Sequence, residues 1–182
     1  RVPGGRDGAD CRRLNGAGGQ HAYELALASG ADTASLSERA RVSLREAGDR
    51  ALSLYAFPAA SRYFRAALAL LEEQDAERPG LLLRLGKSLY YADMGGSDVL
   101  ADAEQSLLAA GDPDSAAEAA MHLADLAYVH GEPHERVFEA AYRALTLVDS
   151  RGPSPSKVDV LLDLAVLLTL VAEHEQAIDL AR

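Results

Sequence analysis

The chain has 182 residues, of which 48% are hydrophobic and 25% are charged, and it contains 35 Ala and 29 Leu but only 10 Val and one Ile. Because Ala and Leu favour helices whereas β-branched residues favour strands, this composition predicts an all-α protein and excludes disordered and collagen-like classes. The formal charge of -10 argues against a nucleic-acid partner, since binding to phosphates requires a basic face.

The first twenty residues differ in composition from the rest. They contain six of the fifteen Gly and four Arg, and they show no apolar periodicity. We therefore interpret residues 1–20 as a disordered leader or linker, and residues 21–182 as one helical repeat domain. Cys11 is the only cysteine and cannot form an internal disulfide, so we expect a reducing, cytoplasmic setting.

Helical periodicity continues through the remainder of the chain, with Gly and Pro at positions where helices can end or begin. The longest apolar run, residues 160–172, is shorter than the roughly 20 residues that a bilayer requires, so we expect no membrane anchor. Ser97 is predicted to cap the helix that follows it. Because the pattern continues to Arg182, we expect the chain to be a piece of a longer protein. The predicted helices are 20–29, 35–56, 58–73, 79–93, 98–110, 114–130, 133–149, 156–171 and 173–182.

Small residues recur at one position in alternate helices. Gly48, Gly86, Ala124 and Ala165 are separated by 38, 38 and 41 residues, and each follows an apolar residue. A small residue lets a partner helix cross closely, so this pattern predicts a series of helical hairpins that stack on one another.

The repeated pattern resembles the tetratricopeptide repeat (TPR) family. The unit 41–74 matches best, and the later units are looser. The resemblance implies a TPR-like, right-handed helical-hairpin solenoid of about four hairpins, the last one truncated, that binds a protein or peptide partner or other domains of its own chain. The family's Trp and closing Pro are missing here. The best unit matches through Leu44, Ala47, Gly48, Ala51, Phe57, Ala60, Phe64 and Ala67.

A second resemblance concerns the setting of these repeats. The segments REAGDRA at 45–51 and AASRYFRAAL at 59–68 resemble the helical region behind the ATPase module of large bacterial signalling proteins. The resemblance implies a non-catalytic regulatory arm in a protein of the adenylate or guanylate cyclase type. The alternatives are the TPR arm of a LuxR-type transcriptional regulator, a free-standing TPR adaptor, or an enzyme with an unrecognised site in the groove on the concave face of the repeats.

Two local motifs suggest ligand sites but have simpler explanations. Gly86-Lys87-Ser88 is similar to the end of a phosphate-binding loop, but Leu81 stands where that motif needs Gly, and the context is a helix whose amides are already bonded. His130 and His134 have a zinc-like spacing, but Gly131 and Pro133 interrupt the helix between them. We therefore expect no catalytic residue, cofactor or metal site in this segment.

A partner would bind the concave face formed by the first helix of each hairpin. Tyr and Met supply apolar contact area, and a Lys and an Asp could orient a bound peptide or helix. The alternative is that the tyrosines only pack between neighbouring hairpins. Helical phase places six residues toward this groove: Lys87, Tyr90, Tyr91, Met121, Asp125 and Tyr128.

Overall fold

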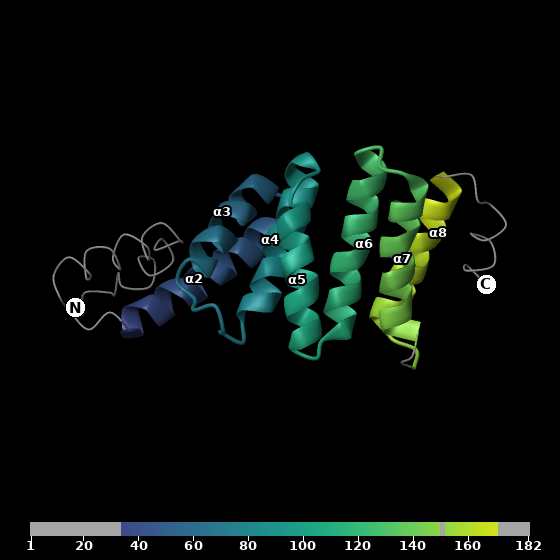
Figure 1. Cartoon of the computed structure of the whole chain (residues 1–182). Helices are drawn as coiled ribbons and strands as arrows, with labels where there is room; N and C mark the ends of the chain where they lie inside the picture. The colour runs from purple at the N-terminus through teal and green to yellow at the C-terminus, as the bar shows by residue number, and fades with distance from the viewer. Residues whose placement is uncertain (1–33, 150–151, 171–182) are drawn as a thin grey trace, which may run out of the picture. The chain divides into compact units, whose positions relative to one another are not determined.

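The computed structural model describes residues 34–149 and 152–170, and these residues form helices and no strands (Figure 1). The prediction of an all-α fold is confirmed for these ranges. None of their helices is both long enough and apolar enough to cross a membrane. The leader 1–20 and the predicted helices 20–29 and 173–182 lie outside the described residues. The helices are α2 (Ala34–Ser53), α3 (Phe57–Leu68), α4 (Arg78–Asp93), α5 (Ser97–Ala109), α6 (Pro113–Val129), α7 (His134–Asp149) and α8 (Pro155–Leu170).

Most helix boundaries fall within one residue of the prediction, but two C-terminal ends were predicted wrongly. Helix α2 ends at Ser53 because Tyr55 adopts a left-handed conformation with φ of 57°, and the Ala56 amide donates back to the Ala51 carbonyl. Helix α3 ends at Leu68, where the Leu71 amide donates only three residues back.

The cap predicted at Ser97 is also wrong. Gly96 occupies the N-cap position of α5 with φ of 89°, and no side chain of the described residues caps the helix. A Cβ atom at Gly96 would lie 2.8 Å from Cβ of Leu89, so both the backbone conformation and the close approach require glycine there.

The described chain divides into two compact units at Glu72, and the first contains α2 packed against α3. The contact between them is built around Gly48. A Cβ atom at this position would lie 2.5 Å from the ring of Phe64, which is fully buried. The predicted role of Gly48 as a close helix crossing is thus confirmed.

The second unit contains α4 to α8, in which each helix packs against the next (Figure 1). Gly86 of α4 meets Leu100 of α5 in the way that Gly48 meets Phe64, because a Cβ atom at Gly86 would lie 2.6 Å from Cδ2 of Leu100. Helix α6 is central, since it also contacts α4 and α8. The alternate helices α4, α6 and α8 are therefore neighbours, and side chains from all three can meet.

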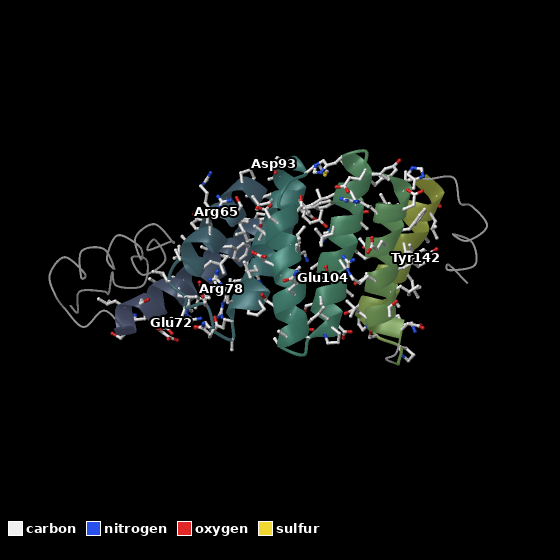
Figure 2. The ribbon with its side chains drawn as sticks, viewed as in Figure 1. Arg65, Glu72, Arg78, Asp93, Glu104 and Tyr142 are labelled. Atoms are coloured by element: carbon white, nitrogen blue, oxygen red, sulfur yellow. The ribbon has the colours of Figure 1, made fainter. Side chains whose placement is uncertain are left out.

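Helices α5 and α7 of this unit are joined by an ion pair. The Arg143 guanidinium donates through Nε to Oε1 of Glu104 at 2.6 Å and through Nη2 to Oε2 at 3.2 Å. Glu104, labelled on α5 in Figure 2, is only 7% exposed. Its hydrogen bonds raise the pKa of Arg143 above its usual range. The two-point contact fixes α7 against a buried carboxylate.

Candidate functional site

A pocket of about 270 Å³ lies where α4, α6 and α8 meet. Helix α4 contributes one residue, and α6 and α8 contribute the others. Its walls combine carboxylates with aromatic and apolar side chains. The lining residues are Tyr91, Asp114, Glu118, Met121, His122, Ser156, Asp159, Val160, Leu162 and Asp163.

Three of the predicted groove residues are engaged in contacts between α4 and α6. The Lys87 ammonium forms an ion pair with Glu118. The Tyr90 hydroxyl donates a hydrogen bond to Oδ2 of Asp125 at 3.3 Å. These contacts hold the two helices in register beside the pocket, and neither Lys87 nor Asp125 lines it.

The other three predicted residues lie in different surroundings. Tyr91 lines the pocket and is 46% exposed. Met121 also lines the pocket, but it is 2% exposed and belongs to the core of α6, α7 and α8. Tyr128 is half-buried against that same core, which fits the alternative interpretation of a packing residue. Tyr91 is therefore the predicted residue with the most surface available to a partner.

His122 is a pocket residue that the sequence did not indicate. It is 9% exposed, and its Nδ1 has no hydrogen-bond partner among the described residues. Its ring lies 4.7 Å from that of Tyr90 and 5.9 Å from that of Tyr91, centre to centre. Burial lowers the pKa of His122 to about 4 against the opposing effect of Glu118, so the imidazole is neutral at pH 7.

The carboxylates around the pocket repel one another. Burial raises the pKa of Asp125 to about 6, and the charge of Asp163 adds to this, whereas the hydrogen bond from Tyr90 opposes it. Burial, with the charges of Asp159 and Glu118, also raises the pKa of Asp163. Burial and Asp125 together raise the pKa of Tyr90 to about 12. Burial is the largest cause of each of these shifts, and the neighbouring carboxylates add to it in the same direction.

Only a weak signal in the sequence could have identified the carboxylates. Asp163 interrupts the apolar run 160–172, which by itself argues only against a membrane span. A charged residue within an apolar run indicates that one face of the helix lies outside the apolar core. Asp159 lies four residues earlier on the same face, and together they bring two negative charges toward α6.

The two local motifs have structural explanations. Gly86-Lys87-Ser88 lies inside α4, where the Ser88 hydroxyl donates to the Arg84 carbonyl at 2.7 Å. Nε2 of His130 lies 3.0 Å from the Met94 carbonyl oxygen, and the ring of His134 packs edge-on near that of Phe138.

No protein-family model matches the chain, and no curated protein matches its sequence.

Proposed function

We propose that this chain is a non-catalytic protein–protein interaction and regulatory scaffold, built as a TPR-like helical repeat region. One observation carries the proposal: the alternate helices α4, α6 and α8 are neighbours and contribute side chains to a single pocket. Stacked helical hairpins characteristically present their first helices as a shared binding surface. Tyr91, with nearly half its surface exposed, provides an aromatic contact on that surface.

The proposed setting is a bacterial ATPase-linked signalling protein of the adenylate or guanylate cyclase type. The segments 45–51 and 59–68 support it through their resemblance to the helical region of such proteins. In that setting the repeats bind a partner, or another domain of the same chain, in the cytoplasm and so control the ATPase. Sequencing the gene in both directions tests this: an upstream phosphate-binding loop supports it, whereas a downstream helix-turn-helix domain favours a LuxR-type regulator.

The binding role is tested with two exposed tyrosines on different helices. Tyr91 lies on α4 and is 46% exposed, and Tyr142 lies on α7 and is 41% exposed. A partner is first isolated on the immobilised chain, and its affinity is then measured by calorimetric titration. We expect Tyr91→Ala to weaken binding about tenfold or more and Tyr142→Ala to change it little, with similar thermal stability for both variants. Equal affinities of the two variants would contradict a binding surface on the first helices.

A further inference from the structure

Helix α8, the last described helix of the second unit, is apolar on two opposite sides (Figure 1). One side is buried against α6 and α7. On the other side an aliphatic side chain recurs every four residues, and each of the four is more than half exposed. A continuous apolar row of this length is typical of a surface that another protein segment covers. The α8 row consists of Val158, Leu162, Val166 and Leu170.

The turn after α2 presents a second exposed apolar surface, in the first unit. Leu54 and Tyr55 are 76% and 80% exposed. Tyr55 occupies the left-handed position that ends the helix, where glycine is usual because a side chain costs free energy there. Its ring has an edge-on contact with Phe57 at 6.0 Å, centre to centre, yet most of its surface faces solvent. A large exposed side chain kept in a disfavoured conformation points to a binding role.

The charges beside these two surfaces are opposite. Asp159 and Asp163 lie at the surface of α8, each three residues before a member of the α8 row, which is the spacing of neighbours on a helix. Arg50 is exposed one turn before Leu54, whose amide donates to the Arg50 carbonyl at 3.2 Å. The units differ in the same direction, because the first has ten basic and eight acidic residues and the second has eight basic and twenty acidic. The two surfaces are therefore complementary in charge as well as apolar.

We propose that the chain associates head to tail with a second copy of itself, so that the turn at Leu54 and Tyr55 of one copy docks on the α8 row of the next. Arg50 of the first copy then lies beside Asp159 and Asp163 of the second. Because the two surfaces differ, the contact is heterologous, and a dimer keeps one free surface of each kind on which further copies can add. This self-association goes beyond the proposed scaffold function, which concerns a different protein or domain.

Sedimentation velocity of the full chain tests this proposal. The mean mass should rise as the concentration increases from about 10 to about 300 µM. Two double variants each remove one surface. The turn variant carries Leu54→Ser with Tyr55→Asn, since Asn accepts the left-handed conformation. The row variant carries Leu162→Gln with Val166→Gln, since Gln is polar and favours helices. Each variant should weaken self-association at least tenfold.

Mixing the two double variants distinguishes a head-to-tail contact from a symmetric one. Each variant retains the surface that the other lacks, so an equimolar mixture should form 1:1 dimers and nothing larger. In a symmetric pairing of two α8 helices, the turn variant would associate as the parent does, and the row variant would not join it. That result would overturn the proposal.

Two matched controls separate these surfaces from exposed residues elsewhere. The double variant Leu108→Gln with Val129→Gln removes exposed apolar side chains of α5 and α6 and should leave the association within twofold. Arg50→Gln should weaken the association severalfold, whereas Arg39→Gln, an exposed arginine of the same helix, should change it less than twofold. Because every substituted residue is exposed, the thermal melts of all variants should lie close to that of the parent.

Three further results would overturn the head-to-tail contact. The first is a chain that stays monomeric over the whole concentration range. The second is a monomer in which the methyl groups of Ile178, the only isoleucine, show nuclear Overhauser contacts with Val166, because residues 171–182 would then cover the α8 row. The third is an equal loss of association in the Leu108 and Val129 control, which would mean that exposed apolar area in general drives it.

Discussion

Neutralising Asp125 should stabilise the chain at neutral pH. The carboxyl is half-buried on α6, accepts a hydrogen bond from Tyr90 and faces the negative charge of Asp163, and its pKa rises from 3.8 to about 6. A raised carboxyl pKa means that the folded state disfavours the ionised form. The stability that the protonated Asp125 carboxyl adds to the folded state is complete below the pKa of the unfolded state, and it is lost as the pH rises through the pKa of the folded state. Asp125→Asn mimics the protonated form and retains an oxygen for the Tyr90 hydroxyl.

The size of the effect follows from the pKa difference. A rise from 3.8 to about 6 corresponds to an upper limit of about 3 kcal/mol when the carboxyl is fully ionised. Because the side chain is partly exposed, solvent screening reduces the expected gain to about 1–2 kcal/mol at pH 7.5. The gain should shrink to well under half at pH 4, where the parent carboxyl is protonated in the folded state and partly protonated in the unfolded state.

Urea unfolding of parent and variant at pH 7.5 and pH 4 measures this difference. Asp102→Asn serves as the control, since it removes an exposed carboxylate of α5 and should change the free energy of unfolding by less than about 0.5 kcal/mol. If Asp125→Asn is no more stable than the parent at pH 7.5, or if its gain is undiminished at pH 4, then burial and repulsion do not destabilise the ionised form of this carboxyl.

Two further substitutions test the packing of the second unit by chemical denaturation. Gly86→Ala places a methyl group against the fully buried Leu100, whereas Gly80 in the same helix meets only the end of an arginine side chain. The Gly86→Ala variant should therefore be less stable than the Gly80→Ala variant by about 1–3 kcal/mol. Equal stabilities of the two variants would show that Leu100 moves aside freely. Arg143→Met removes both donors from the buried Glu104 carboxylate and should lower the free energy of unfolding by about 1.5–3 kcal/mol at pH 7. The loss should be smaller in a chain that already carries Glu104→Gln. An equal loss in the two backgrounds would mean that the two side chains are not coupled.

The sequence predicts the helices and their crossings well because both depend on short-range patterns. Pro and Gly at the turns define most boundaries, and a glycine within an amphipathic helix indicates where a partner approaches, as Gly48 and Gly86 do. The end of α2 was missed for the converse reason. Tyr55 adopts a left-handed conformation that is unusual for tyrosine, so the residue types at this turn do not indicate that the helix ends there.

The pocket was predicted only in part because it depends on contacts between helices distant in sequence. Helical phase placed Tyr91 and Met121 toward the first-helix face, and both line the pocket. Asp159 and Asp163 would ordinarily be interpreted as solvated charges on an exposed face. Their significance arises only because α8 packs beside α6, which brings them near Glu118. No local pattern encodes that proximity.

The mutual repulsion of these carboxylates also affects the stability of the chain. Burial and neighbouring charges raise the pKa of Asp163, so its ionised form is disfavoured in the folded state, and Asp163→Asn should stabilise the chain at neutral pH. Urea unfolding at pH 7.5 measures this gain, with Asp102→Asn, an exposed carboxylate of α5, as the matched control. If Asp163→Asn is no more stable than the parent, then Asp159 and Glu118 do not disfavour the ionised form of this carboxyl.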